Sequence, residues 1–227
     1  MTSTEELMKK ILDTENLQSN LLEWKEQLFV YKFALDEINT KLNILNEEYQ
    51  HIHNHNPIEH MKSRIKSPAS IVKKLERKGL EITIENALEH IQDIAGVRIT
   101  CSFISDIYIL FDAISRQDDI EVIRVKDYIQ QPKLNGYKSL HLIVKVPVFL
   151  SNQVKKVNVE IQIRTIAMDF WASLEHKIYY KFDKEIPQEL QLELKEAAEA
   201  AHDLDEKMKK IRDEVDFYKN NINEKQV

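Results

Sequence analysis

Residues 157–165, VNVEIQIRT, alternate apolar and polar side chains without a break. Since successive side chains of a β-strand point to opposite faces, this alternation predicts a strand with one apolar and one polar face. The apolar face would consist of Val157, Val159, Ile161 and Ile163. The polar face would carry Asn158, Glu160, Gln162 and Arg164. Such a run of amide, carboxylate and guanidinium groups either forms cross-strand ion pairs or lines a site.

Similar patterns on both sides of this stretch predict a sheet with several strands. Strands are predicted at 60–66, 96–103, 121–126, 139–148 and 154–164. Helices are predicted from the Ser67-Pro68 cap to Gly79, and at 84–93, 106–116 and 165–180. Because helices and strands interleave, we expect an α/β or α+β domain with a sheet flanked by helices.

Two longer segments repeat apolar residues every three and four positions, which is typical of amphipathic helices. The first stripe contains Leu17, Leu21, Trp24, Leu28, Tyr31, Leu35, Ile38, Leu42, Leu45 and Tyr49. The second contains Leu190, Leu194, Ala197, Ala201, Leu204, Met208, Ile211, Val215 and Tyr218. The two helices either cover the central domain as an antiparallel pair or build an oligomer, and both interpretations stay open. The predicted division is a helical segment at 1–56, a central domain at 57–182 and a second helical segment at 183–227.

Composition excludes several classes of protein. The net charge of −6 argues against binding nucleic acid or anionic membrane by general attraction. A single cysteine, Cys101, allows no intrachain disulfide, and no run of 18 apolar residues or N-terminal signal peptide is present, so we expect a cytoplasmic protein. The only glycines are Gly79, Gly96 and Gly136, too widely spaced for a glycine-rich phosphate loop, so side chains must hold any phosphates.

The basic stretch RIKSPASIVKKLERKG (64–79) predicts a second functional surface. At about 100° per residue, the predicted helix separates an apolar side from a polar side. The polar side contains Ser70, Lys73, Lys74 and Arg77. This surface is either a solvated basic face or a cradle for a polyphosphate, whose several negative charges need cations close by.

Two shorter motifs, each weak alone, add candidate groups. In DIAGVR (93–98), Asp93 is predicted at a helix end, and Arg98 on the strand face opposite Val97. In KDYIQQPKLNGYKSLH (126–141), Asn-Gly and Pro mark a loop that is followed by Tyr137. That tyrosine could stack on a base or lie half-buried in the sheet.

In this order and spacing, RIKSPASI, DIAGVRI, KDYI with PK and NGYKSLH, and VEIQIRT with FWASLEH resemble the synthetase domain of RelA/SpoT-type enzymes. The resemblance covers roughly residues 57–182, and with only helical flanks the chain resembles a small alarmone synthetase. It implies an α+β fold with a nucleotidyltransferase-like mixed sheet flanked by helices. It also implies transfer of the β,γ-pyrophosphate of ATP to the 3′-hydroxyl of GDP or GTP, producing (p)ppGpp and AMP. Mg²⁺ is the implied cofactor, and a homotetramer built through the helical flanks is the implied assembly.

The resemblance assigns roles to individual residues. Asp93 would hold the magnesium ion, while Glu160 would activate the ribose 3′-hydroxyl and share the metal. ATP would contact Arg64, Lys66, Ser70, Lys74, Arg77 and Arg98, with Arg64 and Arg98 flanking adenine. GDP or GTP would contact Lys133, Asn135, Tyr137, Lys138, His141, Gln162, Arg164, Asp169 and Glu175, with Tyr137 stacked on guanine. For Asp169 the reason is chemical, since its carboxylate could accept hydrogen bonds from guanine N1–H and N2–H₂.

Two histidine groups are open to other interpretations. His202-Asp203 is the only His-Asp pair, and without further metal-ligand motifs we interpret it as surface and expect no hydrolase activity. His51, His53 and His55 would share a face in an extended chain, which favours either a solvated linker or a transition-metal site.

Two further classes of function compete with the synthetase. A nucleotide sensor without catalysis would not need two carboxylates beside polyphosphates, so Asp93 and Glu160 favour the enzyme. An RNA-binding helical scaffold is disfavoured by the acidic net charge and by the lack of an aromatic-rich strand motif. The preferred acceptor and any allosteric regulation are not encoded in recognisable motifs.

Overall fold

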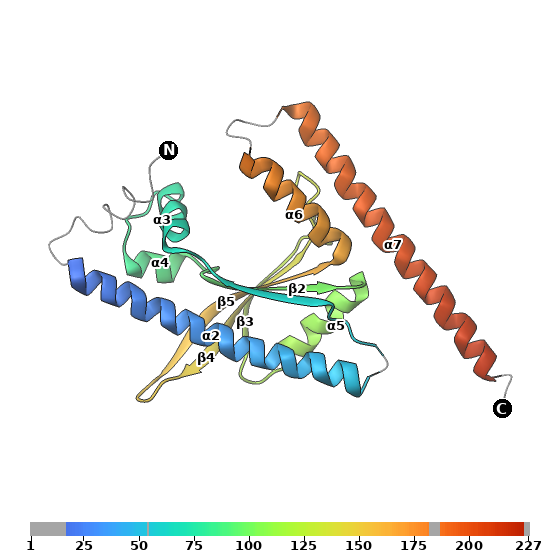
Figure 1. Cartoon of the computed structure of the whole chain (residues 1–227), viewed down its shortest axis with the longest axis horizontal. Coiled ribbons are helices and arrows are strands. Elements are labelled where there is room, and N and C mark those ends of the chain that lie inside the picture. Colours follow the sequence, from blue (N-terminus) through green and yellow to red (C-terminus); the bar gives the residue numbers. More distant parts are fainter. Residues whose placement is uncertain (1–16, 54, 182–186, 225–227) are drawn as a thin grey trace.

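The computed structural model describes residues 17–53, 55–181 and 187–224 (Figure 1). The first ten residues, on which the expectation of no signal peptide rests, lie outside this part of the chain. The elements are α2 (Leu17–His51), β1 (His60–Ile65), α3 (Pro68–Arg77), α4 (Ile84–His90), β2 (Ala95–Cys101), α5 (Ile104–Ser115), β3 (Glu121–Asp127), β4 (Leu140–Phe149), β5 (Val154–Thr165), α6 (Ile166–Lys181) and α7 (Gln188–Glu224). None of the described helices combines the length and apolar composition that a membrane span requires.

The five strands form one mixed sheet, which confirms the predicted α+β class. Their order is β1-β2-β5-β4-β3, and only β2 and β5 run parallel to each other. This parallel pair sets Gly96 opposite Glu160. The turn before β2 therefore lies beside the part of β5 that carries Glu160, which places two distant parts of the chain next to each other.

The apolar face of the sheet forms the core. Val159, Ile161 and Ile163 are fully buried, as the alternation in 157–165 predicts. Helix α2 crosses this face over the middle of the sheet (Figure 1), and α5 packs on the same side. The opposite face, which carries the polar side chains of β5, is left for the site.

Local capping explains the helix that follows β1. The Ser67 hydroxyl accepts a hydrogen bond from the Ser70 amide at 3.3 Å, and Pro68 occupies the first turn, where its missing N–H costs nothing. Gly79 ends the segment with φ of +69°, a conformation that favours glycine. The next helix differs from its prediction, because α4 ends at His90 and Asp93 lies in the following turn rather than at the helix end.

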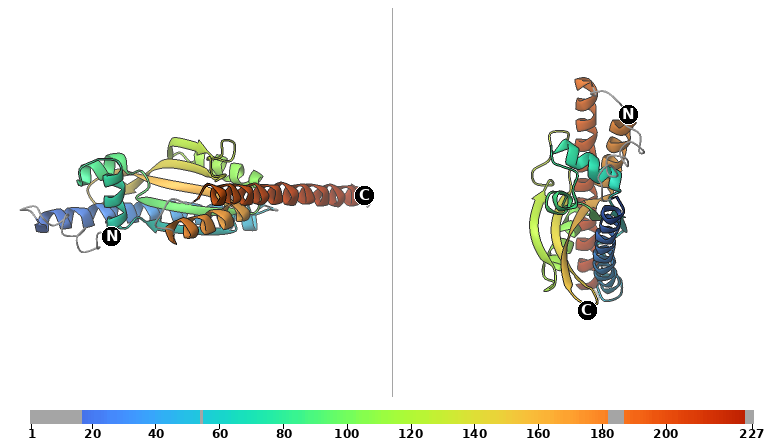
Figure 2. Two further views of the ribbon diagram at one scale, coloured as in Figure 1. Left: turned by 90° about the horizontal axis from the view of Figure 1, so that it is seen from above. Right: turned by 90° about the vertical axis from the view of Figure 1, so that its left-hand side faces the viewer.

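The two long helices use their apolar stripes differently. In α2 the stripe packs into the core, with Ile38 and Leu42 fully buried, although the side chains of Leu17 and Leu21 lie outside the described ones. Helix α7 packs instead along α6 and the start of α5, and its far end projects beyond the sheet (Figure 2). Of the two interpretations that the sequence left open, the antiparallel pair is therefore wrong, because in the described residues α2 packs on the sheet while α7 packs on α6 and α5.

The histidine cluster is divided among separate partners. His51 is the last residue of α2, His53 contacts Glu48 at 3.4 Å, and the Nε2 atom of His55 contacts Asp106 at 2.9 Å. Within the described ranges no group of three potential metal ligands forms. The structure thus gives these histidines no common face.

Candidate active site

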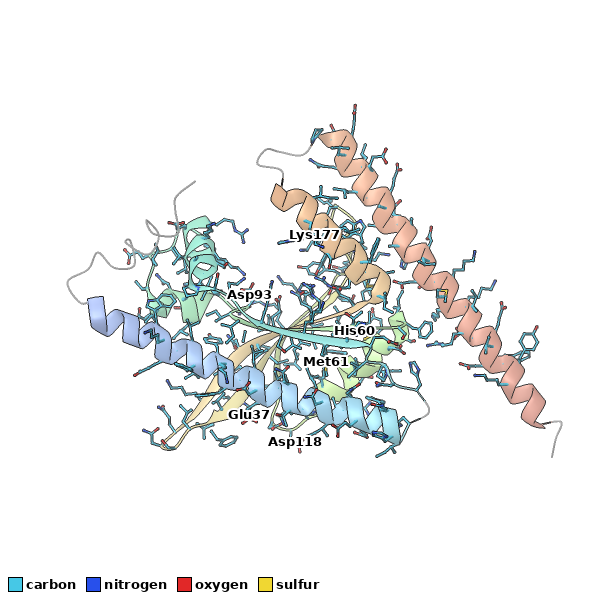
Figure 3. All side chains as sticks on the ribbon, viewed as in Figure 1. Glu37, His60, Met61, Asp93, Asp118 and Lys177 are labelled. Carbon is cyan, nitrogen blue, oxygen red and sulfur yellow. The ribbon has the colours of Figure 1, made fainter. Side chains whose placement is uncertain are left out.

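Two lysines neutralise the carboxylate of Asp93. Lys66 Nζ lies 2.9 Å from Asp93 Oδ2, and Lys74 Nζ lies 2.7 Å from Oδ1. Lys66 directly follows β1, and Lys74 projects from α3, so two cations of the basic stretch meet at this turn. Figure 3 labels Asp93 beside α3. Burial alone would raise the pKa of Asp93, but the two ammonium groups outweigh it and lower the pKa below its ordinary value. Asp93 is therefore ionised at neutral pH.

Glu160 belongs to a continuous chain of hydrogen bonds along β5. Gln162 donates from Nε2 to Glu160 at 2.8 Å, and Arg164 donates from Nη2 to Gln162 Oε1 at 3.0 Å. The polar face of VNVEIQIRT is thus a ladder in which each side chain fixes the next. The alternative interpretation of this face, ion pairing across strands, also holds in part. His141 of the neighbouring strand β4 has its Nδ1 atom 3.2 Å from Glu160.

The protonation of this chain follows from its ends. An ionised Glu160 can only accept, so His141 must donate from Nδ1, while its Nε2 lies 2.8 Å from the Tyr137 hydroxyl and accepts from it when the imidazole is neutral. Arg164 in turn donates to that hydroxyl at 2.5 Å. Burial alone would raise the pKa of Glu160, but His141 and Gln162 lower it below its ordinary value, against a smaller opposing effect of Asp93. Glu160 is therefore an ionised and only weakly basic carboxylate at neutral pH.

Asp93 and Glu160 line the same cleft, of about 290 Å³. The other residues lining it are Lys74, Lys78, His90, Gln92, Arg124, Lys126, Tyr128, Lys133, His141 and Ile143. A second hollow of about 270 Å³ lies on the other side of Glu160 and is lined by Lys62, Ser63, Arg64, Gly96, Val97, Arg98 and Gln162. Glu160 therefore stands between two concave surfaces rich in cations, an arrangement suited to two anionic ligands that meet at one carboxylate.

Asp169 ties two arginines together at the edge of the site. Its Oδ1 atom accepts from Arg98 Nη1 at 3.2 Å and from Arg164 Nη1 at 3.3 Å. The pKa of Arg98 is lowered mainly by burial, and the positive charges of the nearby Arg164 and Arg64 add to this effect. Three guanidinium groups thus lie close enough to repel one another, and a single carboxylate partly compensates them.

The loop between β3 and β4 carries Tyr137. Asn135 donates to Glu175 of α6 at 3.0 Å and accepts from the Tyr137 amide at 3.2 Å, which fixes the turn. Lys133 lies 4.5 Å from the centre of the Tyr137 ring. Tyr137 is half-buried as the second interpretation expects, but it lies in the loop before β4 and not in the sheet. Lys133 and Arg164 both lie over its ring, so a base could stack on the face that Lys133 covers only after that side chain moves.

Other predicted residues lie farther from the clefts. Lys138 faces acidic residues of α7 rather than either hollow, and Ser70 contacts Ser67 as part of the helix cap. Arg77 is exposed at the end of α3 and lines neither hollow. His202, interpreted as surface, is half-buried against the Tyr137 loop and α6, and burial lowers its pKa.

Sequence reasoning missed several cations of the larger cleft. Arg124 and Lys126 occupy alternate positions of β3, and Lys126 pairs in register with His141 of β4. Alternation within EVIRVK could have indicated them, but their place beside the site depends on the strand order. Lys78 and His90 follow from the packing of α3 and α4, which has no signal in the sequence.

A buried carboxylate behind the site gives a test of stability. Asp205 of α7 accepts from the Thr165 hydroxyl at 2.6 Å, and burial raises its pKa to about 6. Because the pKa is higher in the folded state, this group stabilises the fold below the unfolded value of 3.8, and the contribution is lost as pH rises through 6. Two pKa units correspond to about 3 kcal/mol.

We expect Asp205→Asn, which keeps an acceptor for Thr165, to be more stable than the parent at pH 7.5 by about 2–3 kcal/mol. The difference should shrink towards zero near pH 4. Urea unfolding at both pH values measures this, with Asp203→Asn on the exposed side of α7 as the control. A variant less stable than the parent at pH 7.5 would contradict the assignment.

Comparison with known proteins identifies relatives of this chain. A family model described as "Region found in RelA / SpoT proteins" matches residues 63–185. GTP pyrophosphokinase YwaC of Bacillus subtilis is 61% identical over 202 residues, which cover 89% of this chain and 96% of the relative. GTP pyrophosphokinase YjbM of the same organism is 42% identical over 193 residues, covering 85% and 90%.

Solved structures agree with this result. Small alarmone synthetase 2 from Bacillus subtilis matches with a TM-score of 0.78 at 60% identity, covering 85% of this chain and 99% of that one. Small alarmone synthetase 1 from the same organism, bound to its product pppGpp, matches with a TM-score of 0.79 at 41% identity, covering 85% and 98%. The chain therefore belongs to the RelA/SpoT family, among its small alarmone synthetases.

Proposed function

We propose that this protein is a GTP pyrophosphokinase, which transfers the β,γ-pyrophosphate of ATP to the 3′-hydroxyl of GDP or GTP and releases AMP and (p)ppGpp. The observation that carries this conclusion is the pair of ionised carboxylates, Asp93 and Glu160, in one cation-lined cleft. A sensor that only binds nucleotides gains nothing from two negative charges beside phosphates. An enzyme does need them, because one carboxylate can hold a metal ion that neutralises the phosphates and the other can orient and deprotonate the acceptor hydroxyl.

In the proposed reaction the acceptor 3′-oxygen attacks the β-phosphorus of ATP. The bond from this phosphorus to the oxygen that bridges to the α-phosphorus breaks, and AMP leaves. Glu160 accepts a hydrogen bond from the 3′-hydroxyl and takes its proton as the new P–O bond forms. Because its pKa is lowered, its main contribution is a fixed, charged acceptor, and most of the rate comes from positioning and charge neutralisation.

The hollow lined by Arg64 and Arg98 is proposed to hold the adenine of ATP. A guanidinium is planar and stacks on a purine, and these two arginines lie on the paired strands β1 and β2. The phosphates would then reach Lys66 and Lys74. The two ammonium groups would leave their ion pairs with Asp93 and bind the polyphosphate instead. The predicted contacts of Ser70 and Arg77 with ATP stay a prediction.

The acceptor is proposed to occupy the opposite side of Glu160. Guanine would stack on Tyr137 once Lys133 leaves the ring, and Lys133 and His141 would face the acceptor phosphates. Arg124 and Lys126 line the same cleft and extend this cationic surface. Gln162, Arg164, Asn135 and Glu175 would shape the wall, and Asp169, whose Oδ2 is not engaged by the two arginines, would accept from guanine. The predicted contact of Lys138 with GDP or GTP stays a prediction, since its side chain faces α7 rather than the cleft.

Magnesium is the proposed cofactor, and the donor set fits it. Mg²⁺ binds oxygen ligands and commonly takes one or two carboxylates together with substrate phosphates. Both carboxylates are kept ionised, and the two ammonium groups on Asp93 already occupy the place that a cation would take. Asp93, with Glu160, would hold the ion, which neutralises charge on the transferring phosphates when bound.

We further propose that the protein is cytoplasmic and forms a homotetramer. The stripe of α7 supports assembly, since Leu204, Met208, Ile211 and Val215 are 44–54% exposed. Four such residues at helical spacing are typical of a face that another helix covers. In contrast, α2 uses its stripe within the core and leaves less for assembly.

One assay tests the function directly. The protein is mixed with labelled ATP, GDP or GTP, and Mg²⁺, and the products are separated. We expect AMP and a 3′-pyrophosphorylated guanosine in equal amounts. Nucleotide binding without these products would instead favour a sensor.

A further inference from the structure

The loop that carries Tyr137 rests against α7. Gly136 has φ of +84°, and a Cβ added there would lie only 2.6 Å from the Cβ of Ala198. The carbonyl oxygen of Lys195 would lie 3.5 Å from the same atom. Gly136 therefore meets two criteria that exclude a side chain: a left-handed backbone and a close approach to a neighbouring helix.

Little space remains at this contact. The residual cavity bounded by Gly136, Ala198 and Trp171 measures about 10 Å³, room for at most about one water molecule. Ala198 is 6% exposed and packs with Trp171 and Ala172 of α6, and Tyr137 and Ala201 pack against this small cluster. Tyr137 and the N-terminal part of α7 thus share one apolar contact, separate from the main core.

Helix α7 is fixed at several points along its length. Thr165 donates to Asp205, and Trp171 donates from Nε1 to the Leu194 carbonyl at 2.9 Å. Arg212 contacts Ser105 at 3.2 Å and lies over the Phe103 ring at 4.3 Å. The loop is a tight turn at the surface, whose neighbouring Leu134 is 99% exposed. When the contact is crowded, the loop should therefore move rather than the helix.

We propose that α7 sets the position of the acceptor loop, with Ala198 as the positioning residue that holds Tyr137 in place through Gly136. Ala198 touches neither substrate. It acts because any added volume at this position must displace the backbone next to Tyr137. This inference rests on the proposed acceptor site, and it separates the two substrates, since Arg64, Lys66 and Lys74 lie on other elements.

A graded series at Ala198 tests the proposal. Ala198→Ser, Ala198→Val and Ala198→Leu are compared with the parent and with Ala200→Leu, which lies on the exposed side of the same helix. Calorimetry measures affinity for GDP and for α,β-methylene-ATP, and steady-state assays give KM for each substrate. Thermal unfolding and size-exclusion chromatography check folding and assembly.

We expect GDP affinity to fall with side-chain volume, from less than twofold for serine to tenfold or more for leucine. Affinity for the ATP analogue should stay within twofold, and Ala200→Leu should match the parent. GDP affinity that is unchanged across the series, or a parallel loss for both nucleotides, would overturn the proposal. Calorimetry needs no turnover, so the two proposals can fail separately. If the parent is inactive but GDP affinity still falls with side-chain volume across the Ala198 series, the result counts against the proposed reaction and for the role of α7. Serine and valine keep the test informative where leucine does not fold.

Discussion

Glu160→Gln is expected to lower turnover by about 10²–10⁴-fold, the usual range for removing a general base, while ATP and GDP still bind. The amide keeps the size of the side chain but can neither take the 3′-hydroxyl proton nor neutralise cations around the phosphates. Single-turnover assays with saturating nucleotides measure the chemical step, and calorimetry measures binding separately. Because the glutamine amide does not titrate, raising the pH should not restore the variant.

The fold should tolerate this substitution, so loss of activity would not merely report unfolding. A glutamine whose oxygen faces Gln162 turns its NH₂ towards His141, which can accept at Nδ1 by taking its other neutral tautomer. The Tyr137 hydroxyl can then accept from both His141 and Arg164. Glu121→Gln makes the same chemical change on exposed β3, where its ion pair with Lys156 contributes little, and should leave turnover intact. A Glu160→Gln enzyme within tenfold of the parent would refute the role given to Glu160.

The element types could be predicted from the sequence because their signals are local. The alternation in VNVEIQIRT and the Ser67-Pro68 cap each depend on neighbours a few residues away, and β5 and α3 follow from them. The polar ladder from Glu160 to Arg164 is local in the same sense, since residues two apart on a strand share a face. Asp93 is an intermediate case, because its motif predicts a chemical role while its two lysine partners come from elsewhere in the fold.

What the sequence could not predict depends on strand order and on packing. Arg124 and Lys126 reach the cleft only because β3 lies beside β4, on the side away from β5. The two amphipathic stripes predict buried faces but not what buries them, and so the sequence left open whether the long helices pair with each other or build an oligomer. Lys138 follows Tyr137 in the loop, yet the charges that act on it are acidic residues of α7, which the local sequence does not reveal. A local pattern identifies a face, while the fold decides what that face meets.

Asp93→Asn is expected to abolish turnover, by more than about 10²-fold, and yet to strengthen binding of ATP in the absence of metal. Turnover falls because the amide is a poor ligand for a divalent cation and leaves the transferring phosphates less neutralised. Metal-free binding improves because Lys66 and Lys74 lose a competing anion at 2.7–2.9 Å. Each charge-assisted hydrogen bond contributes about 1.5–3 kcal/mol, so transfer of even one lysine to phosphate should raise affinity several-fold.

The opposite signs of these two effects make the test specific to the role given to Asp93. Damage to the fold would weaken ATP binding and turnover together, and a purely structural ion pair would lower stability without separating them. Calorimetry with ATP in chelator, and turnover across a Mg²⁺ titration, measure the two quantities. Asp118→Asn, at an exposed position that Figure 3 places by α2 and away from Asp93, should change neither. Weaker metal-free binding, or turnover within tenfold of the parent, would mean that the two lysines hold Asp93 for the sake of the fold. It would also mean that the cation for the reaction is bound by other groups.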